Sequence, residues 1–270
     1  MQTDLLKIEY ILSFATPFHF GTGIREGLID RTVVRDESGY LYVPGSTLKG
    51  VLRESCEQLE RFYENAQGTG TVQSPHDADA ALLGLGHGNP TMVTRIFGSQ
   101  NRPGRLFFDD AHQNKEDLLQ YESQDQADQA EEDKQKRLEK GRYKGLQVDV
   151  STQVRMNRPT RTAVAGALYT SEYGTHDLAF QGVIQGWLEC SAIDVRNNTV
   201  LQGVSPTYSL LLLLAGLHMV DAIGGNKSSG KGRCACEIRA LTVNGVGIER
   251  SAWEAWFEQL DALAKYGREG

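Results

Sequence analysis

The sequence predicts an α+β fold with a ferredoxin-like (RRM-like) core and long insertions. Strand-like and helix-like segments follow one another as strand, helix, strands, helix and strand, which is the βαββαβ order of that core. A hydrophobic content of 40% over 270 residues is normal for a chain that buries a sizeable core. No repeat of 20–50 residues is visible, which argues against a solenoid.

The amino-terminal part supplies one strand, a short hairpin and one helix. Residues 6–15 alternate loosely between apolar and polar side chains, as a half-buried strand does. Residues 32–35 and 40–43 are predicted to pair as a hairpin. A helix begins at Ser46, a good N-cap, and a stripe at helical spacing follows it: Leu48, Val51, Leu52, Ser55, Leu59 and Phe62.

The rest of the chain supplies three strands and two helices. Strands are predicted over residues 105–110, 180–190 and 234–243. A leucine-rich buried helix is predicted over residues 207–223, and Ser251 is expected to cap an amphipathic closing helix. On the last strand, three residues are expected to share one face: Cys236, Ile238 and Ala240.

We expect a single domain over residues 1–270. Residues 68–90 are rich in Gly, Asp, Ala and His, and they are predicted to form an irregular surface segment. The core is expected at about 5–64, 104–112 and 178–245, the insertions at about 66–103 and 113–177, and the closing helix at 251–265.

The net charge of −7 is concentrated in one segment. Between residues 116 and 133 there are eight acidic residues and no basic one. Without these eight, 28 basic residues stand against 27 acidic ones, a net charge of +1. The acidic segment and the basic segment after it are predicted to form an exposed helix or a disordered arm. The acidity of the whole chain therefore does not exclude a nucleic-acid partner.

The sequence predicts a cytoplasmic protein without a membrane segment. The amino terminus lacks a signal-peptide pattern. The longest apolar run, residues 210–217, is far shorter than the roughly 18 residues of a membrane span. Because the four cysteines lack the paired spacing typical of a zinc site, they are expected to be buried free thiols: Cys56, Cys190, Cys234 and Cys236.

A glycine-rich segment before the last strand indicates a polyanion partner. Residues 224–233 read Gly-Gly-Asn-Lys-Ser-Ser-Gly-Lys-Gly-Arg. Glycine lets a backbone approach a ligand closely. A Walker loop follows a strand and opens a helix, whereas this segment follows a helix and precedes a strand. The segment is interpreted as tracking a nucleic-acid backbone, with an ordinary solvated turn as the alternative, and these side chains donate to phosphate oxygens: Asn226, Lys227, Ser228, Ser229, Lys231 and Arg233.

A single carboxylate, Asp30, stands among basic side chains. Arg25, Arg31 and Arg35 lie near it in the sequence. Such a carboxylate can bind a divalent cation or orient a ribose hydroxyl for attack on the neighbouring phosphate. The alternative is an ordinary turn residue. His19, beside the glycine-punctuated loop that precedes Asp30, is the histidine placed to reach RNA.

The predicted helix start near Gly45 and Ser46 is a candidate anion site. Unpaired N–H groups and the positive end of the helix dipole point out of such a terminus. Lys49 and Arg53 lie one turn apart and add positive charge to one face of the helix. The alternative is a solvated cationic face.

An arginine-rich stretch indicates a protruding arm. Arg155, Arg158 and Arg161 recur at every third residue, and no acidic residue lies among them. Pro159 disfavours a continued helix, so an extended, β-hairpin-like arm is expected. Arginines on such an arm suit phosphate contact and base stacking, and Met156 suits wedging between bases. A basic surface loop is the alternative.

These stretches together resemble the RAMP superfamily, the repeat-associated proteins of CRISPR effector complexes. The matching motifs follow the family order: FHFGTG, GLIDRTVVRDESGYLYVPGSTLKGVLRE, RMNRPTRTAVAGALYTSE and GGNKSSGKGR. The second motif is the most specific. It is similar to the type III backbone subunits, in which an Ile-Asp-x-x-Val-x-Arg-Asp cluster precedes Ile-Pro-Gly-Ser-x-Leu-Lys-Gly and a helix.

The resemblance implies a subunit that stacks with other copies along a guide RNA, with a thumb-like hairpin that interrupts the guide–target duplex. Its partners would be the crRNA, the complementary target RNA, other RAMP subunits, and the large and small subunits of a type III complex. In catalytic members the loop Asp supports target-RNA cleavage with a divalent cation such as Mg²⁺ or Mn²⁺. Carried over, Asp30 takes the catalytic and metal-binding position, Lys49 and Arg53 the guide-binding helix, residues 155–161 the thumb base and residues 224–233 the loop beside RNA.

The chain also departs from the family pattern. Asn157 and Pro159 stand where the pattern favours acidic residues, so the geometry of the thumb tip stays open. Three other functions stay open as well. They are a non-catalytic crRNA-binding scaffold, a guide-processing endoribonuclease of the same superfamily, and a small-molecule phosphate-binding protein.

Overall fold

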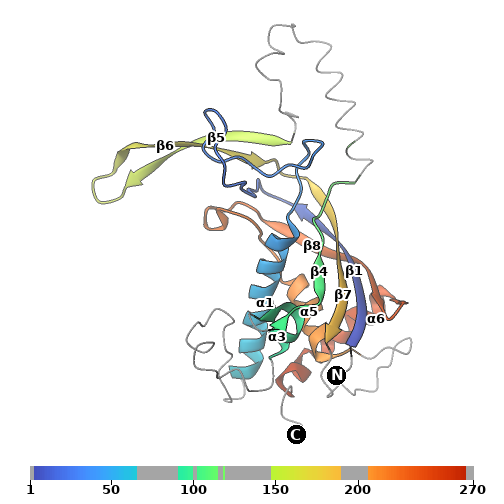
Figure 1. The fold of residues 1–270 in the computed structure, drawn as a ribbon. Coiled ribbons are helices and arrows are strands. Elements are labelled where there is room, and N and C mark those ends of the chain that lie inside the picture. Colours follow the sequence, from blue (N-terminus) through green and yellow to red (C-terminus); the bar gives the residue numbers. More distant parts are fainter. Residues whose placement is uncertain are drawn as a thin grey trace.

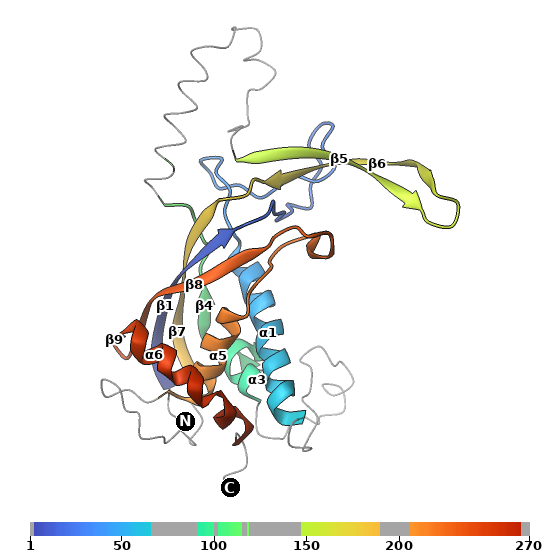
Figure 2. The same cartoon turned by 180° about the vertical axis from the view of Figure 1, so that it is seen from behind.

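The computed structural model describes residues 3–65, 91–99, 102–114, 118, 147–189 and 206–265. These residues form a five-stranded antiparallel sheet, helices that pack on one of its faces, and a long β-hairpin that projects from one end (Figures 1 and 2). The predicted α+β class is confirmed. Three predictions fall wholly or mostly outside the described residues: the surface segment 68–90, the charged segment 116–144 and the thiol of Cys190.

The sheet is built around its first strand. β1 (Thr3–Phe14) lies between β7 (Ala179–Glu189) and β8 (Cys234–Val243). Two three-residue strands, β4 (Leu106–Phe108) and β9 (Val246–Ile248), form the edges of the order β4-β7-β1-β8-β9. Every neighbouring pair is antiparallel. Alternate side chains of β1 point into the core, as the period of two requires: Leu6, Ile8, Tyr10, Leu12 and Phe14.

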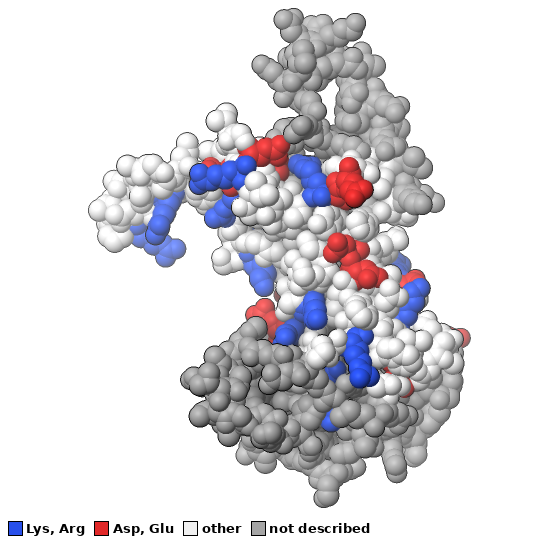
Figure 3. All heavy atoms as spheres, viewed as in Figure 1, with Lys and Arg blue, Asp and Glu red and all other residues white. Residues whose placement is uncertain are grey.

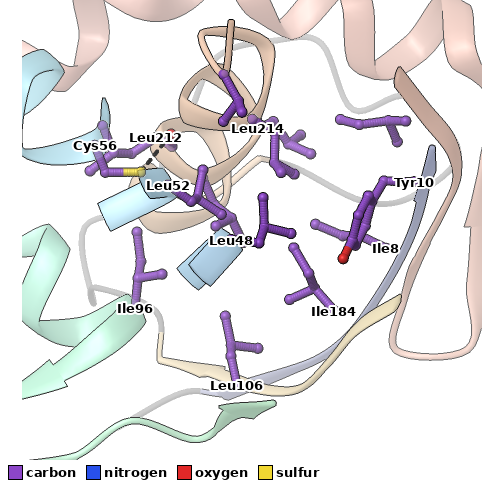
Figure 4. Close-up of a cluster of buried hydrophobic side chains, with 14 of the residues drawn as sticks. Ile8, Tyr10, Leu48, Leu52, Cys56, Ile96, Leu106, Ile184, Leu212 and Leu214 are labelled. Carbon is purple, nitrogen blue, oxygen red and sulfur yellow. Dashed lines mark hydrogen bonds between the residues drawn. The ribbon is translucent and has the colours of Figure 1, made fainter. Parts of the chain in front are cut away.

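Three helices cover one face of this sheet and close the core. They are α1 (Gly45–Asn65), α3 (Met92–Phe97) and α5 (Tyr208–His218). Helix α5 packs against both α1 and α3, and its first ten residues are all buried, so it needs no polar face. Figure 4 shows where α1 and α5 meet, with the Sγ of Cys56 donating to the carbonyl of Leu212 at 3.6 Å.

The chain closes with α6 (Arg250–Trp256) and a 3₁₀ helix, η2 (Phe257–Lys265). The predicted Ser251 cap is wrong, because the helix begins at Arg250 and its N-cap is Glu249, which makes no side-chain capping bond. Helix α5 ends at His218, earlier than predicted. The side chain of Phe62 in α1, expected in the buried stripe, is 67% exposed.

Two strand predictions also needed correction. The segments 32–35 and 40–43 do not form strands; a single bridge joins Arg35 and Leu41 across a turn that the carboxylate of Asp36 closes. On β8 the register against β1 shifts where Glu9 pairs with Ala240 but Tyr10 pairs with Ile238. This bulge adds one residue to β8, so Ala240 faces solvent and does not share the face of Ile238.

The projecting hairpin consists of β5 (Val148–Asn157) and β6 (Thr162–Gly174), which matches the predicted arm. Its turn includes Arg161, whose φ of 56° is in the left-handed region. A short second hairpin pairs β2 (Gly98–Ser99) with β3 (Arg102–Pro103). None of the helices in the described ranges is both long and apolar enough to cross a membrane.

The three described cysteines are free thiols; Cys56 and Cys234 are buried as expected, whereas Cys236 is half-buried. Burial raises the pKa of the Cys56 thiol well above its usual value. Burial also raises the pKa of the Cys234 thiol to about 12, with a further contribution from Asp221, and that of the Cys236 thiol to about 12, with a contribution from Cys234. Thiols held in the neutral form are poor nucleophiles and poor metal ligands.

The contact between α1 and α5 depends on the missing side chain of Gly216. A Cβ at this position would lie 2.5 Å from the Sγ of Cys56 and 3.1 Å from the Cδ1 of Leu52. We expect Gly216→Ala to lower the free energy of unfolding by about 1–3 kcal/mol, measured by urea denaturation, despite its higher helix propensity. Adding Cys56→Ala removes the colliding sulfur, so the double variant should lose less than the sum of the single losses. Additive losses would contradict this packing.

Candidate nucleic-acid interface

Three segments that are distant in the sequence meet at the base of the projecting hairpin. We call this meeting point the hairpin junction and define it by two residues of β6 and their three neighbours in the loops: Thr170 and Tyr173, with His19, Asp30 and Asn226. Figures 1 and 2 show the loop after β1 and the glycine-rich loop before β8 beside the hairpin in both views. The junction therefore joins the predicted catalytic loop, the thumb-like arm and the glycine-rich segment.

The loop that carries Asp30 runs along the free edge of β6. The N–H of Asp30 donates to the carbonyl of Thr170 at 2.9 Å, and the Oδ2 of Asp30 accepts the N–H of Thr170 at 3.0 Å. The Oδ1 of Asp30 lies 3.5 Å from the Nε of Arg25, whose side chain is 80% exposed. The side chain of Asp30 is 30% exposed, so the carboxylate faces solvent and is not turned into the hydrophobic core.

A buried carboxylate holds this loop in place from the other side. The side chain of Glu172 is 1% exposed, its Oε2 accepts the N–H of Val33 at 3.0 Å, and its Oε1 lies 3.3 Å from the Nη2 of Arg35. Buried charges need such partners. Arg35, predicted to contact RNA, is thus placed as the ion-pair partner of Glu172 and is largely buried.

Tyr173 links the hairpin to the glycine-rich loop. Its buried hydroxyl accepts the Nδ2–H of Asn226 and the Nε2–H of Gln153, both at 2.9 Å. The Nζ of Lys231 lies 4.9 Å from the centre of its ring, a cation–π distance. His19 is also buried here, with its Nδ1 2.8 Å from the carbonyl oxygen of Glu172.

The glycine-rich loop has a defined backbone. Asn226 has a φ of 62°, Gly232 a φ of 73°, and a Cβ on Gly232 would lie 2.1 Å from the carbonyl oxygen of Ile223. Only glycine fits there. The carbonyl of His19 accepts the N–H of Gly225 at 2.9 Å, which ties the loop to the junction. Four of its predicted contact residues are exposed: Lys227, Ser228, Ser229 and Arg233.

The start of α1 is organised differently from the prediction. The helix begins at Gly45, so Ser46 is not its N-cap, and the N–H of Gly45 donates to the Oδ1 of Asp110 at 2.7 Å. A carboxylate of the protein itself therefore takes one of the N–H groups that were expected to bind an anion. Ser46 itself is exposed.

The two basic residues of α1 that were predicted to contact RNA, Lys49 and Arg53, contact other parts of the protein. The Nζ of Lys49 lies 5.7 Å from the centre of the Phe108 ring. Arg53 donates to the carbonyl of Gly98 and to Glu57, and its side chain is 20% exposed. A different residue of α1 faces the glycine-rich loop, namely Glu54, whose Oε2 lies 3.8 Å from the Nζ of Lys227.

The arginines of the arm lie toward its free end. Four predicted contact residues there are exposed: Arg155, Met156, Arg158 and Arg161. The β5–β6 register shifts beside Arg155, so β6 has extra residues opposite it and the arm is irregular at this point. Figure 3 shows basic side chains along the hairpin and on the body that faces it, with the surface hollowed beneath the hairpin.

Asp30 alone does not form a closed metal site. Within the described ranges, no group of three or more His, Cys, Asp or Glu side chains is arranged to hold a metal ion. Mg²⁺, however, is commonly held by one or two carboxylates, waters and the phosphates of a substrate. The exposed carboxylate of Asp30 fits an ion of that kind, shared with a bound phosphate, and does not fit an ion held by protein ligands alone.

The sequence reasoning missed the residues of β6 that organise the junction. Tyr169, Thr170, Glu172 and Tyr173 carry these contacts, and none was singled out. One signal was available, because tyrosines four residues apart in an extended segment lie on the same face. The contacts of Thr170 and Glu172 carry no such signal, because they depend on partners more than 130 residues away.

A comparison with models of protein families agrees with the motif pattern. A family model described as the RAMP superfamily matches residues 11–235. Two structures with a similar fold are chains of the Type III-B Cmr-beta, one in the apo state and one bound to cognate target RNA, both from cryo-EM. Each is 14% identical, covers 86% of this chain and 96% of its own length, and has a TM-score of 0.48. No curated protein matches the chain.

The buried ion pair of the junction should contribute strongly to stability. Glu172→Gln keeps the shape of the side chain but leaves Arg35 without its buried counter-charge. We expect the free energy of unfolding to fall by about 3 kcal/mol, measured by urea denaturation. Glu9→Gln is the matched control, since Glu9 pairs with Lys7 at 2.6 Å on an exposed face, and it should cost less than about 1 kcal/mol. Equal losses in the two variants would contradict this assignment.

Proposed function

This chain belongs to the RAMP superfamily, and on that premise we propose that it is a crRNA-binding backbone subunit of a type III CRISPR complex that cleaves target RNA. Asp30 supports the cleavage. One observation carries the proposal: Asp30, the arginine-bearing arm and the glycine-rich loop meet at the hairpin junction. Its partners would be the crRNA, the target RNA, further copies of such subunits and the other subunits of the complex, in the cytoplasm.

The sheet order supports a ferredoxin-like core. The principal elements follow the chain as β1, α1, β4, β7, α5 and β8. In space the four strands run β4-β7-β1-β8, all antiparallel, and β9 is added at one edge. That is the βαββαβ arrangement expected for this core. The arm leaves it between β4 and β7, which places the arm at the end of the sheet where the glycine-rich loop also lies.

The electrostatics of the junction suit a ribose-phosphate strand. Within the described part of the chain, the side chain of Arg25 is held by its ion pair with Asp30 alone. Such solvent-accessible pairs are weak, so its guanidinium can turn to a phosphate. Arg31 and Lys231 add positive charge over the rings of two tyrosines of β6. The basic side chains in Figure 3 line the hairpin and the body that faces it, as backbone contact with RNA requires.

The chemistry of Asp30 follows from its surroundings. Its Oδ2 is oriented by the N–H of Thr170, and its Oδ1 remains open beside Arg25. In this position Asp30 would accept the proton of a ribose 2′-OH that attacks the adjacent phosphate, or would hold a divalent cation shared with that phosphate. As the bond from the 2′-oxygen to phosphorus forms, the bond from phosphorus to the 5′-oxygen breaks, and the leaving 5′-oxygen takes a proton from water. A bound cation would supply charge neutralisation at the phosphate and a lowered pKa of the attacking hydroxyl. Arg25 would stabilise the negative charge that develops on the phosphate oxygens.

The role of the Asp30 carboxylate in cleavage can be tested with a variant of the assembled complex. Asp30→Asn keeps an oxygen to accept the N–H of Thr170, so the loop should keep its position. We expect target-RNA cleavage to fall by at least about 100-fold, as general acid–base groups contribute 10²–10⁴-fold, while RNA binding stays within about twofold. Single-turnover cleavage of labelled RNA and filter binding measure the two quantities. A target with a 2′-deoxy group at the cleaved position should also resist cutting if the ribose hydroxyl is the nucleophile.

The control is Asp149→Asn, which neutralises an exposed carboxylate on the same hairpin. It should leave the cleavage rate unchanged. Cleavage that persists in Asp30→Asn would leave a scaffold role only. Specific cutting of repeat-hairpin RNA by the isolated chain would instead indicate a guide-processing enzyme.

The arm should contribute phosphate contacts that depend on salt. Replacing Arg155, Arg158 and Arg161 by Gln removes three exposed charges. We expect the slope of log K against log salt concentration for RNA binding to become shallower by about 2, since each phosphate contact to a single strand contributes about 0.7. The control replaces Arg239 and Arg250, whose charges already pair with Glu237, and should leave the slope unchanged. An equal slope for the arm variant would rule out phosphate contacts by the arm.

A further inference from the structure

One face of β6 carries two tyrosines, each with a cation over its ring. The Cζ of Arg31 lies 5.2 Å from the centre of the Tyr169 ring, and the Nζ of Lys231 lies 4.9 Å from that of Tyr173. The two tyrosines are four residues apart in an extended strand, so their side chains point to the same side. The strand therefore presents two cation–aromatic pairs in a row.

The two pairs differ in what is left open. Tyr173 is 1% exposed and its hydroxyl already accepts two hydrogen bonds, so this pair is part of the scaffold. Tyr169 is part-exposed and Arg31 is exposed. Among the described residues, neither the guanidinium of Arg31 nor the hydroxyl of Tyr169 has a hydrogen-bonding or ion-pair partner. The two side chains contact each other through the cation–π interaction.

The open pair lies directly beside the candidate catalytic carboxylate. Arg31 follows Asp30 in the chain, and Thr170, which bonds the carboxylate of Asp30, follows Tyr169. The backbone N–H of Arg31 donates to the carbonyl of Thr170 at 3.2 Å, so both pairs of neighbours are held in fixed register. A nucleotide whose phosphate approaches Asp30 would bring its base within reach of Arg31 and Tyr169.

We infer that Arg31 and Tyr169 form a stacking site for one unpaired base of a bound RNA strand. A guanidinium is planar, so it can stack on a tyrosine ring and on a base, while its N–H groups remain free to donate to a phosphate or a base edge. Aromatic and arginine platforms of this kind hold bases of single strands without strong sequence preference. The inference rests on the proposed function in one respect only, that the complex binds RNA.

The test measures base stacking and affinity without relying on cleavage. All variants are made in the Asp30→Asn complex, and the target RNA carries 2-aminopurine at one position at a time. Stacking quenches this fluorophore, so one position should be quenched on binding. Tyr169→Leu should restore its fluorescence and weaken RNA binding by at least about fivefold, as expected for the loss of one stacked base. Tyr169→Phe keeps the ring and should behave like the parent complex.

Two further variants separate stacking from other causes. Arg31→Lys keeps the charge but loses the planar group, so it should also restore the fluorescence, while the salt dependence of binding stays unchanged. Tyr63→Leu removes another part-exposed tyrosine, which lies near the carboxyl-terminal end of α1. This variant should change neither the fluorescence nor the RNA affinity.

Two outcomes would overturn the inference. If the parent complex bound no RNA, the stacking site and the proposed function would both fall. If RNA bound normally and neither Tyr169→Leu nor Arg31→Lys altered fluorescence or affinity, only the stacking site would fall. Equal losses in Tyr169→Leu and Tyr169→Phe would also overturn it, since the phenyl ring can stack as well as the phenol.

Discussion

The buried carboxylate of Glu172 is the constraint on which the functional end of the molecule depends. A charge that is 1% exposed is tolerated only with close partners, and here they are the N–H of Val33 and the guanidinium of Arg35. Both partners lie on the loop that carries Asp30. That loop therefore takes its position only when β6 is in place, and a second contact with β6, from the N–H of Thr170, orients the Asp30 carboxylate.

The basic residues of this end divide into two groups with different physical roles. Arg35 and Arg53 donate to protein acceptors and are mostly covered, so they stabilise the scaffold. Arg25 and Arg31 keep exposed guanidinium groups on the loop beside β6. Buried polar contacts that fix the loop are thus combined with exposed basic side chains that can change partners. The low cost of rearranging exposed ion pairs makes this combination possible.

Much of the fold followed from local patterns in the sequence, because alternation and helical spacing depend on near neighbours. They predicted β1, β7 and β8 and the helices α1 and α5 at close to their observed places. The errors arose where a distant residue decides the local structure. Asp110 takes the N–H of Gly45 and moves the start of α1, and a bulge opposite β1 turns Ala240 outward.

The candidate site shows the same division. The motif residues Asp30, Asn226 and Lys231 were identified in advance, and the structure brings their segments to one junction. The residues that hold them, Glu172 and Tyr173, were not identified, because their structural role depends on partners from other segments. Spacing along α1 also could not reveal that Lys49 contacts Phe108 of β4 and that Arg53 contacts Gly98 of β2.

The two edges of the sheet also affect how this protein can associate with other chains. Both outermost strands, β4 and β9, are only three residues long. An unpaired strand edge is a template on which another chain can add by hydrogen bonding, and short edges are a common protection against such aggregation. Short outer strands keep association from spreading through the sheet and leave it to side-chain surfaces, where specificity can be selected.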